Sequence, residues 1–72
     1  MRYVEFKEAI DRELKRKPTG LTWRELQQRL DLPYDRPCPT WTKKLEDDIR
    51  LSRMKLQGPA LIWRVPASKR NS

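Results

Sequence analysis

The chain has 72 residues, of which 36% are hydrophobic and 38% charged, and its 17 Lys and Arg side chains outnumber its 10 Asp and Glu side chains. A domain of this size buries only about 60% of its unfolded surface, which disfavours a large enclosed active site. With a single cysteine, Cys38, and no histidine, it can form neither an internal disulfide nor a Cys/His zinc site. No apolar run approaches the roughly 20 residues of a membrane span, and the first residues lack a signal peptide's apolar stretch. We therefore expect a cytoplasmic protein without membrane contact, metal or cofactor.

The net charge of +7 is concentrated at one end of the chain. Residues 1–48 carry 11 basic and 10 acidic side chains, whereas residues 49–72 carry six basic side chains and no acidic one. A field of one sign over part of a small protein attracts a polyanion. The charge distribution therefore predicts a polyanionic partner such as a nucleic acid.

The first predicted element is a helix over residues 3–17. Tyr3, Phe6, Ile10 and Leu14 follow one another at spacings of three and four residues, which places them on one face of a helix. The Lys-Pro-Thr-Gly run at 17–20 stops this helix, because the residue before a proline disfavours helical geometry.

A second helix is predicted to begin after Thr22. Thr22 and Glu25 have the spacing of a capping box, in which each side chain bonds the backbone amide of the other residue. Trp23, Leu26 and Leu30 form the apolar stripe of this helix. The three prolines within residues 33–39 then predict a stiff, non-helical connector.

A third helix is predicted over about residues 40–50, capped by Thr40 or Thr42. Its inward face consists of Trp41, Leu45 and Ile49, and its outward face is polar. Three carboxylates on this helix would repel a polyanion unless they are turned away or paired. The i,i+4 spacing predicts three ion pairs, namely Lys43 with Asp47, Lys44 with Asp48, and Glu46 with Arg50.

A two-stranded ribbon is predicted after the third helix. Polar and apolar residues alternate over 50–56 and again over 61–65, with a turn at 57–60 between them. Residues 1–66 would then form one domain, and residues 67–72 a basic, disordered tail. The three tryptophans all fall on core positions of the predicted helices and strands, so we expect them to pack in the interior.

This order of elements, three helices followed by a hairpin, resembles the winged helix-turn-helix superfamily over about residues 3–65. The resemblance implies an α+β, mostly α fold in which the hairpin is the wing, with a very short third strand where Leu21 stands. It also implies that the third helix enters the DNA major groove and that the wing lies along the backbone or minor groove.

The expected function is therefore double-stranded DNA binding, in a transcriptional regulator. The resemblance implies that the start of the third helix contacts bases or phosphates and that the wing contacts phosphates. The basic residues near the end of the chain would add affinity for DNA. The candidate DNA contacts are Thr40, Thr42, Lys43, Lys44, Arg50, Arg53, Lys55, Arg64, Lys69 and Arg70.

Other functions stay open at this point. Winged helices also serve as protein-docking domains, and a mixed-charge third helix suits a protein partner. The Pro- and Trp-containing segment 58–63 has some likeness to the wing of Z-alpha domains, which bind left-handed duplexes, so RNA or an unusual duplex is a third alternative. We expect no enzyme, because the chain lacks histidine, a Gly-rich phosphate loop and an identifiable pair of catalytic carboxylates.

Overall fold

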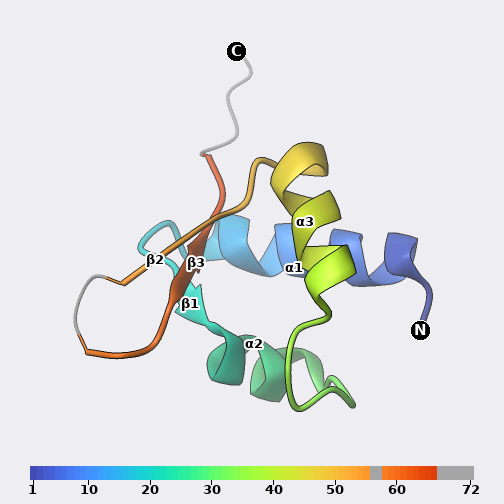
Figure 1. Cartoon of the computed structure of the whole chain (residues 1–72), viewed down its shortest axis with the longest axis horizontal. Coiled ribbons are helices and arrows are strands. Elements are labelled where there is room, and N and C mark those ends of the chain that lie inside the picture. Colours follow the sequence, from blue (N-terminus) through green and yellow to red (C-terminus); the bar gives the residue numbers. More distant parts are fainter. Residues whose placement is uncertain (56–57, 67–72) are drawn as a thin grey trace.

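The computed structural model describes residues 1–55 and 58–66 of the chain. The described elements are α1 (Tyr3–Arg16), β1 (Leu21–Thr22), α2 (Trp23–Leu30), α3 (Pro39–Asp48), β2 (Ser52–Met54) and β3 (Ile62–Arg64). Figure 1 shows the strands gathered on one side of the molecule, with α3 on the other side and the β2 and β3 pair extending away from the helices. The predicted α+β class is confirmed. The predicted basic tail lies outside the described residues.

Helix α1 begins and ends close to its predicted bounds. The backbone amide of Arg2 donates to Oε1 of Glu5 at 3.0 Å, which satisfies one donor at the start of the helix. Phe6, Ile10 and Leu14 are all buried, as their spacing predicts. None of the helices in 1–55 and 58–66 has the length and apolar character needed to cross a membrane.

Helix α2 has the predicted capping box. The amide of Glu25 donates to Oγ1 of Thr22 at 3.1 Å, and the amide of Thr22 donates to Oε1 of Glu25 at 2.9 Å. The helix ends at Asp31, whose φ of 53° is left-handed, and the amide of Leu32 then donates to the carbonyl of Gln27. Two local signals thus set both ends of this helix.

Helix α3 begins earlier than predicted, so the assignment of Thr40 or Thr42 as its cap is wrong. Cys38 occupies the cap position, and Pro39 is the first helical residue. Proline suits that position because its fixed φ is helical and its missing N–H would have had no partner there. Thr42 instead lies within the helix.

The sheet has three antiparallel strands in the order β1-β3-β2. The predicted pairing of the two ribbon strands is present as β2 with β3, and β3 is the central strand of the sheet because Leu21 of β1 pairs with Trp63. The expected short strand at Leu21 is confirmed. The ribbon strands are also shorter than predicted, since Arg50 and Leu51 complete the end of α3, where the amide of Leu51 donates to the carbonyl of Leu45 at 3.3 Å.

Gly20 allows the chain to pass close to the backbone and side chains of β3. Its φ is 97°, and a Cβ atom there would clash with the Ile62 side chain and lie 2.9 Å from the carbonyl oxygen of Trp63. Only glycine tolerates both this φ and this approach. The connection between α1 and β1 can therefore lie directly against the central strand.

One apolar core joins the helices to the sheet. Trp63 of β3 is 1% exposed, and its ring lies 5.4 Å from that of Trp23 on α2. The expectation of core tryptophans is confirmed for Trp63, whereas Trp23 and Trp41 are half-buried. The buried core residues are Phe6, Ile10, Leu14, Leu21, Leu26, Leu32, Leu45, Leu51 and Trp63.

Candidate nucleic-acid interface

The outward face of α3 carries exposed polar side chains. Thr40, Lys43, Lys44 and Asp47 are all exposed, whereas Leu45 on the opposite face is fully buried. At 3.6 residues per turn, Thr40 and Asp47 share the midline of the exposed face, with Lys43 on one flank and Lys44 on the other. An α-helix with exposed polar side chains of this kind can enter the major groove of a duplex, because the groove width of about 12 Å matches the diameter of a helix with its side chains.

Thr42 does not belong to this exposed face. Its side chain is 3% exposed, and its hydroxyl lies 2.8 Å from the carbonyl oxygen of Cys38 and 3.0 Å from that of Pro39. A threonine hydroxyl inside a helix commonly bonds back to the preceding turn in this way. The prediction of Thr42 as a DNA contact is therefore corrected, and Thr42 is a structural residue of α3.

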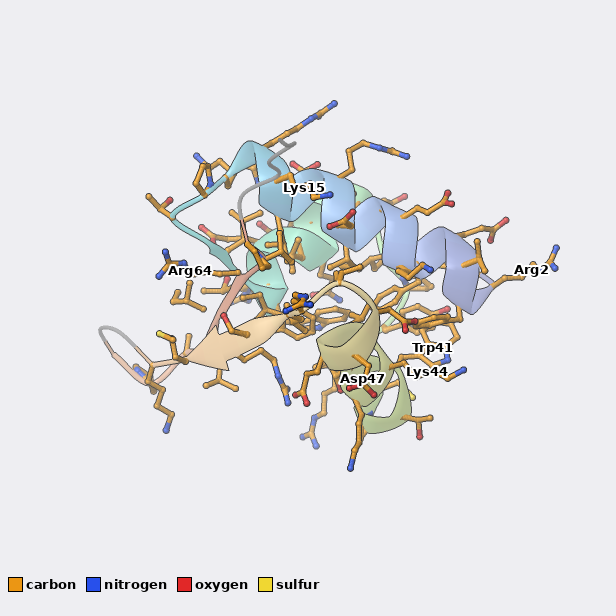
Figure 2. All side chains as sticks on the ribbon, turned by 90° about the horizontal axis from the view of Figure 1, so that it is seen from above. Arg2, Lys15, Trp41, Lys44, Asp47 and Arg64 are labelled. Carbon is orange, nitrogen blue, oxygen red and sulfur yellow. The ribbon has the colours of Figure 1, made fainter. Side chains whose placement is uncertain are left out.

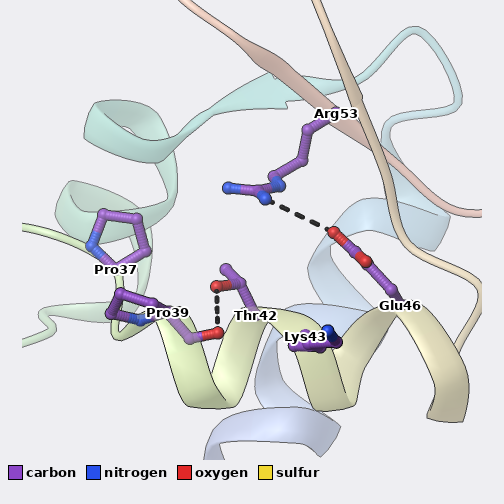
Figure 3. A pocket seen from close by; sticks show the side chains of 6 residues that line it. All are labelled: Pro37, Pro39, Thr42, Lys43, Glu46 and Arg53. Atoms are coloured by element: carbon purple, nitrogen blue, oxygen red, sulfur yellow. Dashed lines mark hydrogen bonds and ion pairs between the residues drawn. The ribbon is translucent and has the colours of Figure 1, made fainter.

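Arg53 of β2 is held by two groups of the protein itself. Its guanidinium donates to a carboxylate oxygen of Glu46 at 3.3 Å and lies 5.7 Å from the ring centre of Trp63. Figure 3 shows this side chain reaching from β2 toward Glu46, above Pro37 and Thr42. A pocket of about 280 Å³ lies between α3 and the sheet, and its lining residues are Pro37, Pro39, Thr42, Lys43, Glu46 and Arg53. Arg53 is thus placed beside α3, with its charge partly neutralised by Glu46.

A second internal contact holds the opposite flank of α3. The Tyr3 hydroxyl donates to a carboxylate oxygen of Asp48 at 2.7 Å, and the Lys44 ammonium lies 4.9 Å from the centre of the Tyr3 ring. Burial, followed by the hydrogen bond to Asp48 and the charges of Asp48 and Asp47, raises the pKa of Tyr3 to about 12. Tyr3 therefore stays protonated at neutral pH and remains a donor to Asp48.

The three ion pairs predicted along α3 are wrong. Within the described part of the chain, neither Lys43 with Asp47, nor Lys44 with Asp48, nor Glu46 with Arg50 comes within 4.0 Å. Glu46 instead contacts Arg53, and Asp48 accepts from Tyr3. Two of the three carboxylates are therefore engaged by other elements, and Asp47 is left exposed on the outward face.

Arg64 is not on the same face of the sheet as Arg53. Arg53 lies opposite Trp63 in the strand register, and Ser52 lies opposite Arg64. Because side chains alternate between the two faces of a strand, Arg64 points away from Arg53 and Trp63. Figure 2 shows Arg64 beside the connection between α1 and β1, far from Lys44 on α3. The structure thus separates two predicted wing contacts that the sequence had grouped together.

Two further candidate contacts, Arg50 and Lys55, lie at the ends of elements. Arg50 follows α3, is exposed and has a left-handed φ of 57°. Lys55 follows β2 and is exposed. Lys69 and Arg70 lie outside the described residues. Thr40, Lys43 and Lys44 thus form one surface on α3, whereas Arg50 lies between α3 and β2 and Lys55 lies after β2.

An apolar hollow beside Arg53 was not predicted. Its volume is about 450 Å³, and its walls include Trp23 of α2, Pro37 of the connector and the turn residues Pro59 and Leu61. Leu61 is 37% exposed. The proline-rich connector was the available sequence signal, but the hollow depends on how the connector packs against the hairpin turn, which no local pattern reveals.

A scan against protein-family models found no match for this chain, and searches of curated proteins and of solved structures found none either.

Proposed function

We propose that this chain is a winged helix module that binds double-stranded DNA, with α3 in the major groove and the β2 and β3 pair along the phosphate backbone. The outward face of α3 carries the proposal. Thr40, Lys43 and Lys44 are exposed there, at the beginning of the helix, where a helix-turn-helix protein contacts bases. The free backbone amides of that first turn also favour phosphate.

The charge balance of the surface supports the same proposal. Residues 39–55 carry five basic and three acidic side chains, for a net charge of +2. Glu46 and Asp48 are engaged by Arg53 and Tyr3, so they turn to the flanks of α3. A duplex approaching the outward face would therefore meet two lysines and a single carboxylate. Phosphate contacts from these lysines would supply affinity and fix the orientation of the helix.

A comparison of two double variants tests this assignment. Lys43→Ala with Lys44→Ala removes two charges from α3, and Arg12→Ala with Lys15→Ala removes two from the exposed surface of α1. Both double variants lower the net charge from +7 to +5. For the α3 variant we expect the slope of log affinity against log salt to become shallower by about 2, since each lost phosphate contact removes about 1. The α1 variant should keep the slope of the unmodified protein.

Equal losses in the two double variants would contradict the proposal, because they would mean that only net charge matters. Competition with an RNA duplex of the same sequence separates DNA from RNA, since the narrow major groove of A-form RNA does not admit a helix. We expect the DNA duplex to compete better.

A protein partner is the second candidate function. The observation that favours it is the apolar hollow lined by Trp23, Pro59 and Leu61, because aromatic and apolar side chains in a depression suit a protein anchor residue. Failure of the chain to bind any duplex at low salt, together with one stoichiometric protein that is lost in Leu61→Ser, would favour this function over DNA binding.

A further inference from the structure

Asp47 is the one acidic side chain on the outward midline of α3. Its neighbours Glu46 and Asp48 are engaged by Arg53 and Tyr3, whereas Asp47 is exposed and forms no ion pair within 4.0 Å among residues 1–55 and 58–66. Figure 2 shows its side chain at the surface of α3, on the same helix as Lys44. Any duplex that lies against this face would therefore meet the Asp47 carboxylate.

We propose that Asp47 is a specificity-determining residue that selects cytosine in the bound duplex. This inference rests on the proposed DNA binding. In the major groove, cytosine presents the N4 amino group as a donor, and a carboxylate is an acceptor for it. Adenine also presents an amino donor, but its N7 acceptor lies beside that donor and repels a carboxylate. Guanine presents acceptors at N7 and O6, which repel a carboxylate as well.

The charge of Asp47 suits base reading better than phosphate contact, and because Asp47 lies in the last turn of α3, it reaches a base only where α3 lies along the groove over its whole length. A carboxylate near the phosphate backbone is repelled, so Asp47 weakens every complex in which no base donor meets it. Lys43 lies four residues earlier, which is about 6 Å along the helix axis. This spacing corresponds to about two base-pair steps of 3.4 Å. The phosphate contacted by Lys43 and the cytosine contacted by Asp47 should therefore be about two steps apart along the duplex.

Selection from a pool of random DNA duplexes tests the inference, using the whole chain and three variants. We expect the unmodified protein to enrich cytosine at one position about tenfold. Asp47→Asn should move the preference at that position to adenine, because an amide both accepts from N6 and donates to N7. Asp47→Ala should lose the preference there and bind non-specific duplex more tightly. The control Glu8→Gln, which removes one exposed negative charge from α1, should keep the cytosine preference.

Two negative results have different meanings. If the chain binds duplex but shows no cytosine preference, or keeps that preference in Asp47→Ala, the role of Asp47 is refuted while DNA binding stands. If the chain binds no duplex even at low salt, the proposed function is refuted and the role of Asp47 with it.

Discussion

Replacement of Gly20 by alanine should destabilise the fold far more than the same replacement at Gly58. Both glycines have positive φ, 97° at Gly20 and 73° at Gly58. For an L-residue such a backbone costs about 1–2 kcal/mol. A Cβ at Gly58 would meet nothing within 4 Å, whereas at Gly20 it would lie 2.9 Å from the backbone carbonyl of Trp63. Gly58→Ala is therefore a matched control for strain without crowding.

The crowding at Gly20 adds an overpacking cost of about 1–3 kcal/mol, so the total for Gly20→Ala is about 2–5 kcal/mol. A domain of 72 residues has roughly 4–11 kcal/mol of stability, which makes this loss a large fraction. Thermal unfolding followed by circular dichroism measures the difference. Gly20→Ala should melt at least about 4 °C below Gly58→Ala, because each kcal/mol shifts the midpoint by about 4–8 °C. Equal midpoints would refute the close approach of residue 20 to the central strand.

Three further predictions concern the core, the flank of α3 and its end. Trp63→Ala, at a site that is 1% exposed, should cost about 3–5 kcal/mol in urea unfolding, and a loss below about 1 kcal/mol would contradict its central place in the core. The pKa of Tyr3 is raised from 10.0 to about 12, so its protonated form should stabilise the fold below pH 10, and this contribution should disappear as the pH rises to 12. Tyr3→Phe should remove that part of the pH dependence of urea unfolding; an unchanged profile would argue against the contact with Asp48. Arg50→Gly, at a φ of 57°, should stabilise the fold by about 1 kcal/mol in thermal unfolding and weaken DNA binding, whereas lower stability would contradict the left-handed backbone.

The elements governed by local signals could be predicted from the sequence. Helix α2 followed from the capping box of Thr22 and Glu25, and α1 followed from the spacing of its apolar residues before the Pro18 stop. The start of α3 was missed because Thr40 looked like a cap, although Pro39 also carried a usable signal as a first helical residue. Two local rules, the cap preference of threonine and the first-turn preference of proline, thus gave different starts for α3.

The arrangement of the candidate site depended on contacts between distant residues. The i,i+4 rule predicted partners for Glu46 and Asp48 on their own helix, but Arg53 and Tyr3 from other elements contact them instead. Arg53 and Arg64 lie on opposite faces of the sheet because of the register of β2 and β3. A count of basic residues cannot reveal that register. The charge count located the basic part of the chain, whereas the tertiary structure decided which of those charges can act together.

The central claim is that the face of α3 and the neighbouring cations bind duplex DNA, and a salt titration tests it most directly. Apart from Arg53, whose guanidinium contacts Glu46, the exposed cations of this region are Lys43, Lys44, Arg50 and Lys55. If each contacts one phosphate, log affinity for random duplex should fall against log salt with a slope of about −4. A slope near zero, or no binding at low salt, would contradict the claim.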